Sequence, residues 1–175
     1  MNSPLQSAMA SKRISTREIV LYALLGALMY AGKMALAFLP NIEPVSLLII
    51  VYTLVLGTRA LWPMYLYIAL EFVTWGISTW SINYLYVWLI LFALTMLCRH
   101  MTSPLHWALL SAGFGLFFGL LCAPVYAFVG GWAYALSWWI SGIPYDLFHC
   151  VGNFSLTLVL YQPCLNTLRQ LYSRF

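Results

Sequence analysis

The chain has 175 residues, of which 63% are hydrophobic and only 7% are charged. Soluble domains carry about 25% charged residues, so a water-soluble chain of this composition would expose large apolar surfaces and aggregate. The composition therefore excludes an ordinary soluble domain and predicts an integral membrane protein. The formal net charge of +4 comes from basic residues that do not cluster, which argues against nucleic-acid binding.

The chain begins with a polar and basic stretch, residues 1–17, which we expect to lie on the cytoplasmic side of the membrane. This polar lead is long, and no small-residue cleavage site follows the next apolar run. We therefore do not expect a cleavable signal peptide.

The first apolar span, residues 19–39, carries a stripe of small side chains. A spacing of four residues places these side chains on one face of a helix, and small side chains let another membrane helix approach closely. Lys33 interrupts the span near its far end. The stripe consists of Ala23, Ala27, Ala31 and Ala35, with Gly26 beside it.

Further apolar spans follow, separated by turns rich in Pro, Gly or charged residues. About 20 apolar residues cross the hydrocarbon core, so the length allows about six helices. The sequence predicts an all-α membrane bundle, a single domain over 1–175, with the helices in 18–172. The spans after the first are 45–56, 60–75, 85–97, 107–129 and 146–170, and the two longest loops are predicted at 76–84 and 130–145.

The basic residues predict the orientation of the bundle. With six spans, both termini and two of the loops lie on one side, and that side receives every Lys and Arg except Lys33. Positive residues mark the cytoplasmic side, so both termini are predicted to be cytoplasmic, in a multi-pass protein of the cell membrane. These basic residues are Lys12, Arg13, Arg17, Arg59, Arg99, Arg169 and Arg174.

Lys33 and Glu71 are charged residues that lie well inside the predicted spans. Lys33 follows Arg17 by 16 residues, about 24 Å along the first helix. Glu71 follows Arg59 by 12 residues, about 18 Å along the third helix. Both fall in the outer half of the membrane, where ionisable groups usually face a partner or a cavity. The alternatives are a structural Lys33–Glu71 ion pair and a ligand pocket open to the outside, and the two are compatible.

Other polar and aromatic residues gather on the same outer side. Asp146, His149 and Asn153 share one face of the last helix, and Tyr84 and Trp88 share a face of the fourth. An ordinary interfacial belt of Trp and Tyr accounts for part of this bias, whereas a polar cavity with an aromatic rim suits a flat, hydrogen-bonding ligand. His149 is open to three interpretations: a core histidine, a ligand contact or a metal ligand.

The sequence gives little indication of catalysis. It contains no HExxH, GxSxG or P-loop motif, so we expect no enzyme, no catalytic residues and no intrinsic cofactor. Any uphill transport then needs a partner or an ion gradient as its energy source.

The chain has four cysteines without CxxC spacing. We expect them to be buried free thiols, and no metal site is predicted. They are Cys98, Cys122, Cys150 and Cys164.

Several of these features together resemble one family, the substrate-binding S-components of energy-coupling factor (ECF) vitamin transporters. The resemblance covers nearly the whole chain and rests on its size, the six spans, the alanine stripe and three segments. These are LPNIEPVSLLIIVYTLVLG (residues 39–57), Glu71 with Trp75-Gly76, and IPYDLFHCVGNF (residues 143–154).

The resemblance implies a transport subunit. In that family the alanine stripe docks on a transmembrane T-component, two cytoplasmic ATPases power the complex, and the S-component is thought to topple in the membrane. The docking face would be Ala23, Ala27 and Ala31. The substrate-binding residues, with Lys33 added from its depth, would be Lys33, Asn41, Glu43, Glu71, Trp75, Tyr84, Trp88, Asp146, His149 and Asn153.

The resemblance leaves the ligand open. The chain looks most like the cobalamin-specific type, so cobalamin is the expected ligand, with pantothenate, riboflavin and a pyrimidine-like vitamin precursor as alternatives. A stand-alone secondary carrier and a small intramembrane enzyme are competing interpretations. Six spans without a visible repeat are few for a carrier, and an enzyme would have only Glu71, Asp146 and His149 as acid or base.

Overall fold

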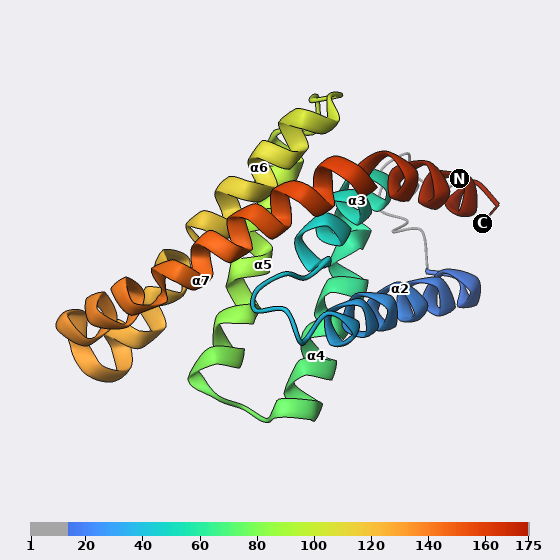
Figure 1. Cartoon of the computed structure of the whole chain (residues 1–175). Coiled ribbons are helices and arrows are strands. Elements are labelled where there is room, and N and C mark those ends of the chain that lie inside the picture. The colour runs from blue at the N-terminus through green and yellow to red at the C-terminus, as the bar shows by residue number, and fades with distance from the viewer. Residues whose placement is uncertain (1–13, 175) are drawn as a thin grey trace, which may run out of the picture.

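The computed structural model describes residues 14–174, which form an all-α structure (Figure 1). Lys12 and Arg13 of the predicted basic end lie outside this range. The helices, in chain order, are α2 (Thr16–Ala35), α3 (Val45–Leu56), the short 3-10 helix η1 (Gly57–Ala60), α4 (Leu61–Trp75), α5 (Thr79–Leu97), α6 (Pro104–Leu116) and α7 (Phe118–Tyr172).

The first helix starts with a reciprocal cap. The Ser15 hydroxyl accepts the Glu18 backbone N–H at 3.2 Å, and the Glu18 carboxylate accepts the Ser15 N–H at 2.8 Å. Such a capping box satisfies two backbone donors that a helix start leaves free. The helix therefore begins at Thr16, just inside the stretch that we predicted to be a polar N-terminal segment. Glu18 also pairs with Arg59, which ties η1 to this end of α2.

Within residues 14–174, four helical segments are long and apolar enough, by length and composition, to cross a membrane. They indicate a multi-pass membrane protein, as the composition predicts. The segments are Thr16–Ala35, Val45–Trp75, Thr79–Leu97 and Pro104–Tyr172.

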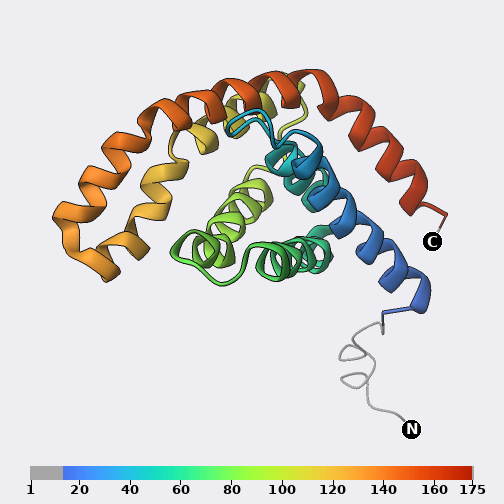
Figure 2. The ribbon, with the colours of Figure 1, turned by 60° about the horizontal axis from the view of Figure 1, so that its bottom comes forward.

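Two of these segments contain a reversal of the chain. Gly57 and Gly131 have φ values of 61° and 81°, a region that glycine enters far more readily than other residues. Figures 1 and 2 show the chain before Gly131 running beside the part of α7 that follows it, in the opposite direction. The 69-residue segment Pro104–Tyr172 therefore consists of two antiparallel arms.

The two long predicted loops are wrong, because most of their residues are helical. Ser78 and Ser81 cap each other reciprocally, so α5 starts at Thr79 and not near residue 85. The helix after Gly131 runs through almost all of 130–145. There Trp138 stacks on Tyr126 of the opposite arm, with ring centroids 3.7 Å apart. The serine and aromatic residues that led us to predict loops have other roles. The serines cap a helix, and the aromatic side chains pack between two helices.

Gly26 belongs to the contact between α2 and α4. A Cβ atom on Gly26 would lie 2.9 Å from the Pro63 carbonyl oxygen and 2.9 Å from a methyl group of Leu66. The glycine therefore allows the two helices to approach each other inside the protein. It does not extend the exposed alanine stripe, beside which the sequence places it.

We expect Gly26→Ala to destabilise the protein by about 1–3 kcal/mol, because the added methyl group forces α2 and α4 apart. The matched control is Gly113→Ala in α6, where an added Cβ meets nothing within 4 Å. The control should be neutral or stabilising by about 0.5–1 kcal/mol, since alanine is the better helix former. Thermal unfolding in detergent measures both variants. Equal stability of the two would contradict this packing.

Candidate functional site

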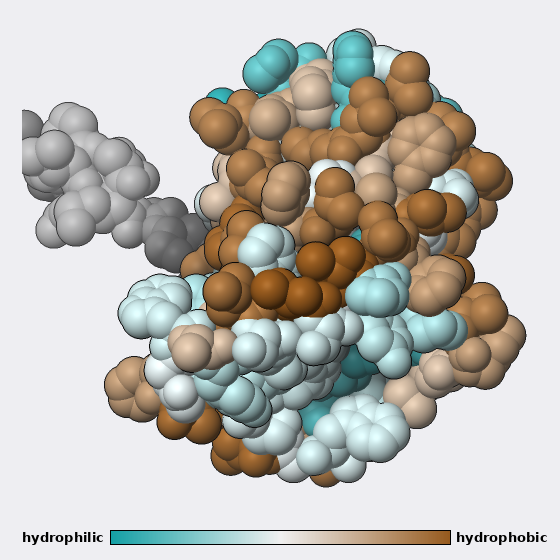
Figure 3. Space-filling view, turned by 60° about the vertical axis from the view of Figure 1, so that its left-hand side comes forward, coloured by the Kyte–Doolittle hydropathy of each residue, from teal (hydrophilic) through white to brown (hydrophobic). Residues whose placement is uncertain are grey.

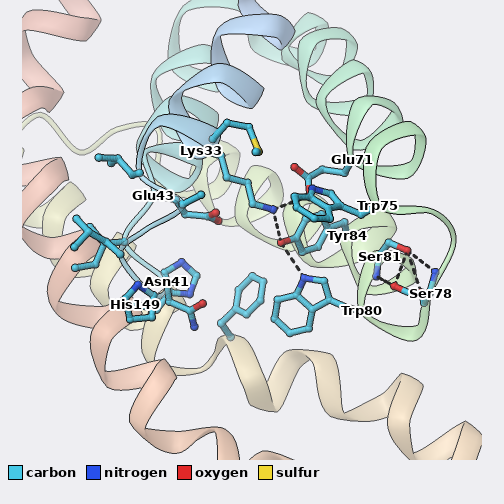
Figure 4. Close-up of a pocket in the computed structure, with 17 residues that line it drawn as sticks. Lys33, Asn41, Glu43, Glu71, Trp75, Ser78, Trp80, Ser81, Tyr84 and His149 are labelled. Carbon is cyan, nitrogen blue, oxygen red and sulfur yellow. Dashed lines mark hydrogen bonds and ion pairs between the residues drawn. The ribbon is translucent and has the colours of Figure 1, made fainter.

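A cavity of about 420 Å³ lies at one end of the bundle, between α2, the 36–44 connection, α4 and α5. Figure 3 shows a hollow with a hydrophilic floor among residues of intermediate hydropathy, below a broad hydrophobic zone. His149 of α7 lies across the cavity from Glu71 (Figure 4), and Phe118 of α7 also lines it. The lining residues are Lys33, Met34, Leu36, Ala37, Leu39, Pro40, Asn41, Ile42, Glu43, Glu71, Trp75, Ser78, Trp80, Ser81, Tyr84, Phe118 and His149.

An ion pair forms one wall of the cavity. The Lys33 ammonium lies 2.6 Å from Oε2 of Glu71 and donates a second hydrogen bond to the Tyr84 hydroxyl at 3.1 Å. Trp80 also donates to that hydroxyl, at 3.2 Å. The Lys33–Glu71 ion pair that the sequence left open is therefore present, and it lies within the cavity wall. Removing charges from water is costly unless they are paired, which explains why these two groups meet.

Glu43 brings a second carboxylate to the same ammonium. Its side chain points toward Lys33 from the opposite side to Glu71 (Figure 4). Among residues 14–174 no hydrogen-bond donor reaches the Glu43 carboxylate, in contrast to Oε2 of Glu71. Burial raises the pKa of Glu43 above its ordinary value, the charge of Glu71 adds to this effect, and Lys33 opposes it.

His149 faces the cavity from α7 without using its ring nitrogens. The side chain is 2% exposed, and neither nitrogen has a hydrogen-bond partner within the described residues. The imidazole packs edge-on against Phe118, with ring centroids 4.8 Å apart. Nearby, Asn41 donates to the Tyr145 backbone carbonyl at 3.2 Å and thereby ties the 36–44 connection to α7.

Aromatic side chains complete the rim. Trp75 is 62% exposed at the end of α4, and Trp80 packs at an angle against both Tyr84 and Phe118. Beneath them Trp88 is fully buried, with its ring centroid 5.5 Å from that of Tyr84. The cavity therefore combines a charged wall with indole and phenyl faces.

The structure brings seven of the ten predicted binding residues to this cavity and places three elsewhere. Trp88 lies under Tyr84 and has no cavity surface. Asp146 accepts the Gly119 backbone N–H at 3.0 Å. Asn153 donates to the Ser46 hydroxyl and the Ser111 carbonyl, both at 3.1 Å. Asp146 and Asn153 therefore hold α7 against its neighbours. The seven are Lys33, Asn41, Glu43, Glu71, Trp75, Tyr84 and His149.

Several lining residues were not among the predicted ones, and Trp80 is the most prominent. It lies four residues before Tyr84, one helical turn away on the same face. This spacing would have identified Trp80 if residues 79–84 had been assigned to a helix. Ser78, Ser81 and Phe118 also line the cavity. Nothing in the sequence alone indicates that Phe118 faces His149.

The alanine stripe lies on the outside of the described structure. Ala23, Ala27, Ala31 and Ala35 are all exposed. The opposite face of α2 is buried against the rest of the protein through Leu21, Leu25 and Met29. The stripe is therefore free to contact lipid or another protein.

No group of three or more His, Cys, Asp or Glu residues that could hold a metal ion occurs within residues 14–174. The four cysteines are free thiols. The other ion pair in this part of the chain, Arg59 with Glu18, lies at the opposite end of α2 from Lys33.

Fold and site together define a helical multi-pass membrane protein with a polar, aromatic-rimmed cavity at one end of its bundle. Comparisons of the chain with protein-family models, with curated proteins and with solved structures give no match. The resemblance to the ECF S-components therefore stays a prediction.

Proposed function

We propose that the chain is the substrate-binding S-component of an ECF-type vitamin importer in the cell membrane. The observation that carries the proposal is the cavity around the Lys33–Glu71 pair, which has a charged wall, is rimmed by tryptophans and is set in an otherwise apolar bundle. Charged groups within a membrane protein usually mark a solute site. Such a site with no catalytic motif beside it fits solute binding better than chemistry.

The proposed topology has six spans and two cytoplasmic termini. The reversals at Gly57 and Gly131 support it, since each divides a long apolar segment into two arms. The distribution of charge also supports it. Arg17, Arg59 and Arg169 lie at helix ends away from the cavity, and positive residues favour the cytoplasmic side. The cavity then opens to the outside.

The exposed alanine stripe supports docking on a T-component. Small residues repeated every fourth position allow close helix–helix contact in a membrane, and the stripe of α2 is exposed in the part of the chain that the structure describes. In this proposal two cytoplasmic ATPases supply the energy, because the chain carries no nucleotide-binding motif of its own.

The cavity volume bears on the choice of ligand. Small-molecule pockets typically measure about 300–1,000 Å³, and this cavity of about 420 Å³ lies toward the lower end of that range. It can enclose a ligand the size of a flavin, pantothenate or a pyrimidine. Cobalamin is several times larger and would extend far beyond the tryptophan rim. Among the ligands that the sequence left open, the geometry favours the smaller ones.

Identifying the molecule that copurifies with the protein tests this proposal. We expect the protein, purified in mild detergent, to carry a vitamin or vitamin precursor in about equimolar amount, detectable by native mass spectrometry. Glu71→Gln should reduce its occupancy, because this carboxylate forms the cavity wall. A protein that retains no small molecule, and binds none of the vitamins named above, would contradict the proposal.

A further inference from the structure

The charges that face the cavity do not balance. Among residues 14–174, Lys33 is the only Lys or Arg that lines the cavity, whereas Glu43 and Glu71 both line it. The Lys33 ammonium is committed to Glu71 at 2.6 Å and to Tyr84 at 3.1 Å. One ammonium neutralises one carboxylate, so an ionised Glu43 has no Lys or Arg of its own as a counter-charge among the described lining residues.

The cavity also contains carboxylate oxygens that have no hydrogen-bond partner among residues 14–174. Oε1 of Glu71 is buried and has no partner among residues 14–174. No donor from the described residues reaches the Glu43 carboxylate. The Tyr84 hydroxyl already accepts two hydrogen bonds, from Lys33 and from Trp80. Buried polar groups are normally paired, so these oxygens predict a ligand that brings N–H groups or positive charge.

The aromatic rim fits the same kind of ligand. Trp75, Trp80 and Phe118 all line the cavity, and indole faces are the most favourable of the aromatic surfaces for cations. A metal ion fits less well, because no group of three or more His, Cys, Asp or Glu residues that could hold one occurs within residues 14–174. An anionic ligand would face Glu43 and Glu71 with a single, already paired ammonium.

On the basis of the proposed function, we propose that the cavity selects a small planar organic cation, and that Glu43 is the counter-ion for its positive group. A protonated amine or a cationic nitrogen heterocycle has this chemistry. Its ring lies against the tryptophans and its N–H groups face the free carboxylate oxygens. Anionic vitamins are rejected because they would place a second negative charge beside an unneutralised one.

The raised pKa of Glu43 adds a second observable consequence. Burial and the charge of Glu71 favour the neutral carboxyl in the free protein, and Lys33 opposes them. A bound cation favours the carboxylate, so binding releases a proton and the affinity rises with pH until Glu43 is ionised in the free protein. The other titratable groups that face Glu43 are Tyr67 and Tyr84, from α4 and α5, and the cavity also contains His149.

The experiment compares two nearly identical ligands by calorimetry on the purified full-length protein. The pyrimidine unit of thiamin is used in its aminomethyl form, which is a cation, and in its hydroxymethyl form, which is neutral. Thiamin, riboflavin and pantothenate extend the series to a larger cation, a neutral ring and an anion. We expect the aminomethyl form to bind at least about tenfold more tightly than the hydroxymethyl form, as for other desolvated charge pairs.

Two variants separate recognition of the ligand's charge from a general loss of folding or stability. Glu43→Gln should remove the tenfold preference and the proton release while leaving the affinity for the neutral form within about twofold. Glu18→Gln makes the same change at the opposite end of α2 and should retain the preference. Tighter binding of a neutral or anionic probe, or an unchanged preference in Glu43→Gln, overturns the charge inference but leaves the proposed function intact. Absence of binding by every probe overturns both.

Discussion

Replacing Ala27 by leucine should abolish energised uptake while leaving ligand binding unchanged. Ala27 lies in the middle of the exposed stripe of α2, on the side of the helix that faces away from the bundle. A leucine there has free space in the isolated subunit. It would project by several atoms into a close contact with a partner helix, and overfilling such a contact costs about 1–3 kcal/mol.

A cost of that size corresponds to a loss of docking affinity of roughly 5- to 150-fold. The measurements are uptake in cells that contain the T-component and the ATPases, co-purification of the complex, and ligand affinity of the isolated subunit. The matched control is Ala93→Leu, at an exposed alanine on α5, which should be silent in all three. Lost ligand binding with an intact complex would show that the stripe serves the cavity and not a partner.

The second large effect is expected for Lys33→Met. This change leaves Glu71, with a side chain only 4% exposed, without its ammonium partner. Removing one member of a buried ion pair typically costs about 3–5 kcal/mol, because the remaining charge is uncompensated. For a chain of this size about 1 kcal/mol changes the melting temperature by roughly 2–4 °C. We therefore expect a fall on the order of 10 °C in the unliganded protein.

A double variant separates two contributions to the loss of stability: the unpaired charge of Glu71 and the lost packing of the Lys33 side chain. Lys33→Met combined with Glu71→Leu removes both charges and should recover most of the stability, since apolar replacements of buried pairs are often neutral or better. The double variant should still fail to bind ligand, because it lacks the polar wall of the cavity. Equal stability of Lys33→Met and the native protein would mean that water, and not Lys33, compensates Glu71.

The helix positions were predictable where hydrophobicity and turn residues agree. The second span was predicted at 45–56 and is α3, Val45–Leu56, because prolines precede it and Gly57 follows it. The loops at 76–84 and 130–145 were wrong because composition does not distinguish a polar loop from a capped helix end. The reciprocal Ser78–Ser81 cap and the Tyr126–Trp138 stack are specific contacts that decide the local structure.

The part of the candidate site that depends on depth in the membrane was predictable from the sequence. Counting helical rise places both Lys33 and Glu71 in the outer half of the membrane, and the two side chains meet at 2.6 Å. The rotation of the last helix about its own axis was harder to predict from the sequence. Residues on one face of a helix can contact different neighbouring elements. His149 faces the cavity, whereas Asp146 and Asn153 from the same face bond to Gly119, Ser46 and Ser111.

The most direct test of the central claim is uptake of the copurified ligand, in labelled form, into vesicles that contain the protein with and without the T-component and the two ATPases. We predict uptake that requires ATP and all of the partner subunits, and that disappears in Ala27→Leu. Uptake by the protein alone, or uptake that follows a proton gradient without ATP, would contradict the account and identify a stand-alone carrier.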